Sequence, residues 1–242
     1  MRERAGATGA HPGSGKRSFS PELFAFLREL QCNNDREWFR ENRTWYVEAV
    51  QEPAIEFIID FQPHLRRISR HFRADGRPVG GSLFRIQRDT RFSRDKTPYK
   101  THVGIHFRHA AAARDVHGPG FYLHLEPGGC FVAVGVWHPD AEALRRVRAA
   151  IAGHPHRWRR AAHGPPFAEA FALSGNVARR LPAEFDPGHR FAEDLRRKDF
   201  VGVAPLRDAE VTAAGFLERF AERCRSGAPL VRFLCRALGL PF

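Results

Sequence analysis

The sequence predicts an α+β fold, in which N-terminal and C-terminal helices flank a mostly antiparallel sheet of about four to five strands. Two observations predict it. Near both ends of the chain, apolar residues recur every three or four positions, as they do on one face of a helix. In between, after the pair Gly80-Gly81, apolar and polar residues alternate, as they do in strands. We expect the helices to cover one face of the sheet.

Three helical stretches are expected before the glycine pair. A Ser-Pro pair suits the start of a helix over residues 20–31. Asn34, with Glu37 three residues later, resembles a capping box that opens a second helix. Pro53 begins a third stretch, which Pro63 is expected to kink or divide.

Strand patterns and further helices follow the glycine pair. The strand-like alternations are residues 84–86, 103–107 and 121–125. Residues 132–137 are apolar on both faces, which makes them the best candidate for a central strand, although periodicity alone does not distinguish them from a buried helix. Helices are expected over residues 140–153, 155–162, 209–224 and 229–238.

The chain is long enough, at 242 residues, to bury a sizeable core, and we expect one α+β domain over residues 19–242. Residues 1–18 are rich in Gly, Ala and Arg, which is typical of a disordered tail and not of a signal peptide. No run approaches the roughly 20 apolar residues that span a bilayer. A cytoplasmic protein that does not associate with membranes is therefore expected. Residues 164–188 are punctuated by Pro and Gly, which favours a long connection.

The sequence gives little sign of a cofactor. The four cysteines include no CxxC pair, so we expect neither a zinc knuckle nor a disulfide framework, and we expect the thiols to be buried. No GxGxxG motif or P-loop is present, and no serine has the context of a nucleophile elbow. We therefore predict no cofactor and no metal. The net charge of +12 favours acidic partners without identifying them.

A basic segment over residues 85–108 is the most informative part of the sequence, because it holds seven cationic side chains against two anionic ones. Residues 89–98 have the pattern of a loop, and a loop can turn several cations toward a common point. Asp89 and Asp95 are the candidate catalytic residues. The candidate ligand-binding residues are Arg85, Arg88, Arg91, Arg94, Lys96, Lys100, His102 and His124.

Three interpretations of the basic segment are open. Converging guanidinium and ammonium groups would bind phosphate or carboxylate oxygens. In a second interpretation, Asp89 and Asp95 hold the arginines in a lattice of ion pairs that only fixes the loop. In a third, one of these aspartates is a general base in hydrolysis or phosphoryl transfer, with Arg91 and Lys96 stabilising the developing negative charge.

A polar face rich in histidine is expected on two of the strands, where it could line one groove. His124 and Glu126 would lie roughly 7 Å apart along a strand and could share a metal ion, whereas His102 and His106, roughly 13 Å apart, could not. Since no further ligand is identifiable, no metal site is predicted. The polar positions are His102, Gly104, His106 and Arg108 on one strand and Tyr122, His124 and Glu126 on the next.

Two motifs carry a resemblance to a known family: NNDREWF at residues 33–39 and RDTRFSRDKTPYK at residues 88–100. Together with segments at 121–127, 135–139 and 194–200, they make the chain similar, from about residue 19 to residue 240, to the family called domain of unknown function 2461. The resemblance implies a soluble, mainly single-domain protein with no established biochemical activity. Arg94 stands where a Lys is more usual in this family, which keeps the charge but replaces a compact ammonium with a planar fork.

Binding is the leading hypothesis. We expect residues 88–100, with Arg85, His102 and His124, to form a basic cleft for a phosphorylated or other anionic ligand, either an anionic small molecule or nucleic acid. The alternatives are a hydrolase or phosphoryl-transfer enzyme that uses the same loop, and a structural or interaction module in which the charged motif only locks the fold. The sequence indicates no oligomeric state.

Overall fold

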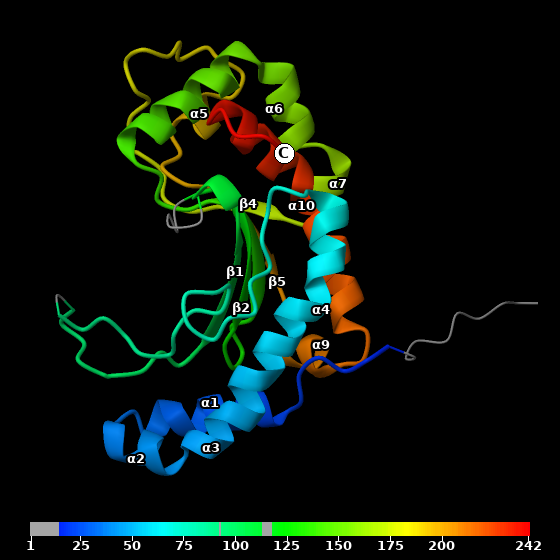
Figure 1. Cartoon of the computed structure of the whole chain (residues 1–242). Coiled ribbons are helices and arrows are strands. Elements are labelled where there is room, and N and C mark those ends of the chain that lie inside the picture. The colour runs from blue at the N-terminus through cyan, green and yellow to red at the C-terminus, as the bar shows by residue number, and fades with distance from the viewer. Residues whose placement is uncertain (1–14, 92, 113–117) are drawn as a thin grey trace, which may run out of the picture.

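The computed structural model describes residues 15–91, 93–112 and 118–242. The strands in these ranges form one antiparallel sheet in the order β1-β2-β3-β5-β4. The predicted α+β fold, with helices that flank an antiparallel sheet, is therefore confirmed (Figure 1). The central strand is β3, as expected. The strands are β1 (Val103–Arg108), β2 (Gly120–Leu125), β3 (Phe131–Val136), β4 (Ala172–Ser174) and β5 (Phe200–Pro205).

The N-terminal helices agree with the predicted pattern except at one proline. Pro63 does not divide the third stretch, because α4 continues through this proline. Pro63 lacks an N–H and so removes one hydrogen bond from α4, but packing holds the helix in place. The elements are α1 (Glu22–Cys32), α2 (Arg36–Glu41), α3 (Arg43–Tyr46), the π-helical turn η1 (Val47–Gln51) and α4 (Glu52–Ile68).

The C-terminal part departs from the prediction in three places. The helices expected over 209–224 and 229–238 are a short α9 and one long α10 that continues through Pro229. The expected connection over 164–188 contains α7 and β4, and β5 had no predicted counterpart. The helices are α5 (Ala141–Gly153), α6 (Pro155–Ala162), α7 (Pro165–Ala168), α8 (Ala192–Leu195), α9 (Asp208–Thr212) and α10 (Phe216–Ala237).

The expected strand over residues 84–86 is not formed. Leu83 and Gln87 make only isolated bridges, to Ile105 and Tyr99. Hydrogen bonds from Phe84 N to the Gly104 carbonyl (2.9 Å) and from His106 N to the Ser82 carbonyl (2.8 Å) hold the segment along the outer edge of β1.

Asp35, and not Asn34, caps α2. The Asp35 carboxylate accepts hydrogen bonds from the backbone N–H groups of Glu37 and Trp38, both at 2.9 Å. The Asn34 side chain instead bonds both backbone groups of Tyr99, at 3.0 and 3.1 Å. Asn34 therefore links the basic segment, at Tyr99, to the N-terminal helices.

One face of the sheet is covered by α4 and α10, which lie along one side of it, whereas the segment around residues 80–100 lies on the other (Figure 1). Phe61 of α4 and Phe220 of α10 both pack against Phe107 of β1, with ring centroids 4.6 and 5.9 Å apart. Burying each such ring contributes roughly 1.5–3 kcal/mol. The covered face carries Ile105, Phe107, Phe121, Leu123, Val132, Val134 and Ala204, each at most 1% exposed.

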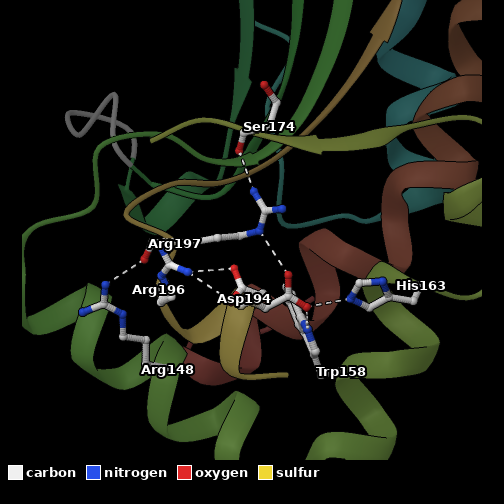
Figure 2. A network of polar contacts seen from close by, with 8 residues as sticks. Arg148, Trp158, His163, Ser174, Asp194, Arg196 and Arg197 are labelled. Atoms are coloured by element: carbon white, nitrogen blue, oxygen red, sulfur yellow. Dashed lines mark hydrogen bonds and ion pairs between the residues drawn. The ribbon is translucent and has the colours of Figure 1, made fainter. Parts of the chain in front are cut away.

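The buried carboxylate of Asp194, on α8, links α6 to the segment that precedes β5. Asp194 accepts hydrogen bonds from Trp158 Nε1 (2.8 Å), His163 Nε2 (2.7 Å) and Arg197 Nε (3.1 Å), as Figure 2 shows. Three donors satisfy a carboxylate that would otherwise be costly to bury. The network fixes α6 against the segment that leads into β5.

Most of the expected tail lies outside the described residues, which begin at Gly15. Lys16 Nζ lies 2.9 Å from the Asp60 carboxylate of α4.

The cysteines agree with the prediction at Cys130, Cys224 and Cys235, which are buried, but Cys32 is exposed. None of the helices in the described ranges is long and apolar enough to cross a bilayer.

Gly227 sets how closely α10 approaches the sheet. A Cβ at this position would lie 2.7 Å from Cγ2 of Val134, closer than such atoms pack. We expect Gly227→Ala to lower the free energy of unfolding by about 1–2 kcal/mol, because overpacking outweighs the better helix propensity of Ala. Urea unfolding measures this. The matched control is Gly153→Ala at the end of α5, where a Cβ would meet nothing within 4 Å; equal stability of the two variants would contradict the close packing.

Candidate functional site

The face of the sheet that α4 and α10 do not cover contains a cavity of about 570 Å³, which we call the sheet-face pocket. Because side chains alternate between faces, the residues between the buried apolar positions all point to this side. Phe84 and Lys100, from the segment beside β1, also line it. Two cross-strand rows pass through the pocket: His106, Tyr122, Ala133 and Val203, and then Gly120, Gly135, Val201 and Ser174.

The pocket has a polar side and an apolar side. The polar residues belong to β1, β2 and the segment that precedes them, and the apolar residues belong mainly to β3 and β5. Trp137, which is 56% exposed, lies at the rim. The polar side comprises Lys100, His102, His106, Tyr122 and His124, and the apolar side comprises Phe131, Ala133, Val201 and Val203.

A chain of hydrogen bonds runs through Tyr122, His124 and Glu126. Tyr122 Oη lies 3.1 Å from His124 Nδ1, and His124 Nε2 lies 3.1 Å from Glu126 Oε2. An ionised carboxylate only accepts, so Nε2 carries the proton and the Nδ1 of the neutral ring accepts from the Tyr122 hydroxyl. The Tyr122 oxygen therefore keeps its lone pairs available to a donor in the pocket.

The His124 ring lies between two other rings: it is stacked on Phe131 of the apolar side and tilted against His102. The ring centroid of His124 lies 4.4 Å from that of His102 and 4.5 Å from that of Phe131. Two glycines make room for the neighbouring side chains of Tyr122 and His106. A Cβ at Gly104 would lie 2.7 Å from Tyr122 Oη, and one at Gly120 would lie 2.3 Å from His106 Nε2.

Burial keeps the histidine and tyrosine side chains of the polar side neutral. It lowers the pKa of His102 to about 4, with His124 as the second cause, and the pKa of His106 to about 3, with Arg108 as the second cause. The pKa of His124 is also lowered, because burial outweighs the attraction of Glu126. Burial, and then Glu126, raise the pKa of Tyr122. At neutral pH these residues offer hydrogen bonds without charge.

Lys100 is the cation of the pocket. Its side chain is half-buried, its Nζ donates to the Arg85 carbonyl at 2.8 Å, and it lies 5.5 Å from the centroid of the Phe84 ring. Among the described residues, no carboxylate lies within 4 Å of it. Burial, and then Arg85, lower the pKa of Lys100. An anion in the pocket would offset both effects.

Asp199 holds two segments of the pocket rim in place. Its fully buried carboxylate accepts from the backbone N–H groups of His138 (2.7 Å) and Asn176 (2.8 Å). His138 has a φ of 48°, a left-handed conformation that non-glycine residues rarely adopt without such support. The neighbouring Trp137 and Gly175 line the pocket. Asp199 was not among the residues predicted from the sequence, where its only signal is a charged residue directly before an apolar run.

Residues 88–97 of the basic segment, which we call the basic loop, contain two ion pairs between their own side chains. Arg91 contacts Asp89 through Nη2 at 2.7 Å and Nε at 3.0 Å, and Arg88 contacts both Asp95 and Thr97. The hydrogen bonds from Arg91 and Arg88 lower the pKa values of Asp89 and Asp95, respectively, to about 2. A carboxylate with so low a pKa is a weak base. These contacts favour the lattice interpretation of the loop and do not favour a catalytic role for either aspartate.

The structure brings together only some of the candidate ligand-binding residues. Lys100, His102 and His124 line the sheet-face pocket, together with His106 and Tyr122 of the predicted polar face. Lys96 instead donates to the Thr90 carbonyl at 2.9 Å. The candidates that do not line the pocket are Arg85, Arg88, Arg91, Arg94 and Lys96, and neither Asp89 nor Asp95 lines it.

The apolar side of the pocket was not recognised from the sequence. Residues 132–137 are apolar at every position, which indicates burial on both faces, but here the second face is a pocket wall. The described residues include no group of three His, Cys, Asp or Glu side chains that could hold a metal ion.

The fold and the pocket define an α+β protein with a ligand-sized cavity on the open face of an antiparallel sheet. The chain belongs to the family described as conserved hypothetical protein (DUF2461), whose model matches residues 22–233. Neither a curated protein nor a solved structure matches the chain.

The depressed pKa of His102 predicts a specific pH dependence. The folded value of about 4 lies below the ordinary 6.5, so between these values the unfolded chain binds more protons. The stabilisation from a neutral His102 is therefore complete above about pH 6.5 and is lost as the pH falls to about 4. NMR titration of the His102 imidazole should give a midpoint near pH 4. In the His102→Gln variant, the free energy of unfolding should decrease less than in the unchanged protein as the pH falls from 6.5 to 4. A midpoint near 6.5 would contradict the burial.

Proposed function

We propose that the protein binds a small organic anion in the sheet-face pocket, with the anionic group beside Lys100 and the apolar body against β3 and β5. The observation that carries this proposal is a half-buried ammonium that lines a ligand-sized cavity and has no described carboxylate within 4 Å. Charges are rarely buried unless they are paired, so this one favours a partner that comes from outside the chain.

The distribution of polar groups supports a ligand with two unlike ends. Lys100 offers a charge-assisted hydrogen bond to carboxylate or phosphate oxygens. The Tyr122 oxygen, whose proton is engaged with His124, accepts a hydrogen bond from a ligand donor. Phe131 and Val203 offer only apolar surface. A carboxylate or phosphate monoester on a compact apolar or aromatic body matches this arrangement.

This proposal keeps an anionic ligand but moves its site from the basic loop to the pocket. The guanidinium groups of Arg88 and Arg91 already contact carboxylates, whereas Lys100 does not. A long loop that is locked by its own ion pairs can position Lys100 without contacting the ligand. In this proposal the lattice is therefore structural and serves the pocket.

The enzymatic alternative has weaker support. A hydrolase or phosphoryl-transfer enzyme needs a base, and Asp89 and Asp95 are held in ion pairs outside the pocket. His124, inside the pocket, has both ring nitrogens in hydrogen bonds. It would have to break one of them before it could take a proton from a ligand. We therefore propose binding and not catalysis.

A thermal-shift panel tests the proposal. The panel contains aromatic and aliphatic carboxylates and phosphate monoesters, each beside its neutral amide or alcohol. An anionic member at about 100 times its Kd should stabilise the protein by about 2.7 kcal/mol, and its neutral partner by clearly less. Lys100→Met should abolish the stabilisation.

The control is Lys96→Met, which removes the same charge from the loop outside the pocket. It should leave the stabilisation unchanged. A ligand that still stabilises Lys100→Met but no longer stabilises Lys96→Met would place the anion site on the loop and contradict the proposal.

A further inference from the structure

A second cavity lies between α6 and α10, on helices that take no part in the sheet-face pocket. Its volume is about 760 Å³, and α5 contributes to its edge through Ala150. Among the described residues, its lining includes no Asp or Glu. We call it the arginine groove after its charged lining, which consists of Arg157 and Arg160 of α6 and Arg225, Arg232 and Arg236 of α10.

The arginines of α10 form a straight row. Arg225, Arg232 and Arg236 are separated by seven and four residues, so at 100° per residue they lie within about 40° of one another around the helix. The row extends about 16 Å along the axis. On α6, Arg157 and Arg160 are three residues apart and therefore also share a face. Two rows of guanidinium groups thus border one groove.

Both helices are held rigidly beneath these arginines. Trp158, between Arg157 and Arg160, is fully buried and donates to Asp194 at 2.8 Å, which fixes the rotation of α6 (Figure 2). Its ring packs against Phe233 of α10, with the centroids 5.1 Å apart. The five arginines are exposed above this buried layer.

Most of the arginine charge is unbalanced. Glu222 pairs with Arg225, and the Arg232 guanidinium lies 4.8 Å from the centroid of the Phe242 ring. Within the described ranges, no carboxylate lies within 4 Å of Arg157, Arg160 or Arg236. One carboxylate for five guanidinium groups leaves a strong local attraction for anions.

The shape of the groove favours an extended polyanion over a single small ion. A nucleic-acid strand carries one phosphate per about 3.4 Å of axis, so a row of about 16 Å spans several phosphates. Single strands are bound mainly by aromatic side chains on which bases stack. Of the two aromatic rings in the described lining, Phe233 is buried at 9% exposure and the His154 imidazole is exposed. A single exposed ring is no platform for successive bases. The lining therefore suits the phosphate backbone of a duplex and not exposed bases.

We infer that the arginine groove binds the backbone of double-stranded nucleic acid without sequence preference. Five guanidinium groups on two rigid helices contact phosphate oxygens, and the net charge of +12 adds long-range attraction. The inference is independent of the sheet-face pocket. It holds or fails whether or not a small anion binds there.

Fluorescence anisotropy with a short labelled DNA duplex tests the inference on the full chain. The Kd should lie at about 10⁻⁴–10⁻⁶ M near physiological salt and should be the same for unrelated sequences. The logarithm of the binding constant should fall with the logarithm of the salt concentration with a slope of about −4 to −5, for up to five phosphate contacts.

The variant Arg232→Ala/Arg236→Ala should weaken binding and reduce that slope by about two, because two phosphate contacts are lost. The matched control is Arg36→Ala/Arg43→Ala, which removes two exposed arginines from α2 and α3 at the other end of the molecule (Figure 1). It should change the slope little.

An equal loss in both double variants would show general charge attraction and overturn the groove as the site. Binding to vesicles of phosphatidylglycerol and phosphatidylcholine without any binding to the duplex would overturn the choice of nucleic acid. A duplex that binds with no salt dependence would overturn the phosphate contacts.

Discussion

The burial of one face of the sheet beneath α4 and α10 is the constraint on which the rest of the structure depends. Phe61, Phe107 and Phe220 meet across this interface, and Gly227 lets α10 approach β3 closely. Because strand side chains alternate, every residue that packs under the helices sends its neighbours to the opposite face. The sheet-face pocket follows from this alternation, since Tyr122 lies between the fully buried Phe121 and Leu123.

The charges of the molecule are arranged in three different ways. In the basic loop, Arg88 and Arg91 are paired with Asp95 and Asp89, so their charge mainly fixes local conformation. In the sheet-face pocket, burial leaves histidine and tyrosine side chains neutral around the ammonium of Lys100. In the arginine groove, guanidinium groups outnumber carboxylates and face solvent. A net charge alone therefore says little about where an anion binds.

The sequence predicted the parts of the structure that depend on local periodicity. The strands around residues 103–107 and 121–125 were found because one of their faces is polar. The structure differs from the prediction where contacts between residues far apart in the sequence determine the local conformation. Packing keeps α10 continuous through Pro229, and the Asn34 side chain bonds the backbone of Tyr99 and does not cap α2. The loop arginines were candidates because loops can bring cations together. The partners of Arg88 and Arg91 are instead Asp95 and Asp89 of the same segment, a short-range pairing.

Chemical-shift mapping by NMR tests most directly whether the pocket, and not the loop, is the small-anion site. A stabilising carboxylate or phosphate monoester would be titrated into isotope-labelled protein. We expect shifts of the Trp137 indole N–H and of the Gly135 and Gly175 amides, because these residues line the pocket, with little change at Asp89 or Asp95. Shifts confined to residues 88–97, with the pocket signals unmoved, would place the anion on the loop and rule out the pocket.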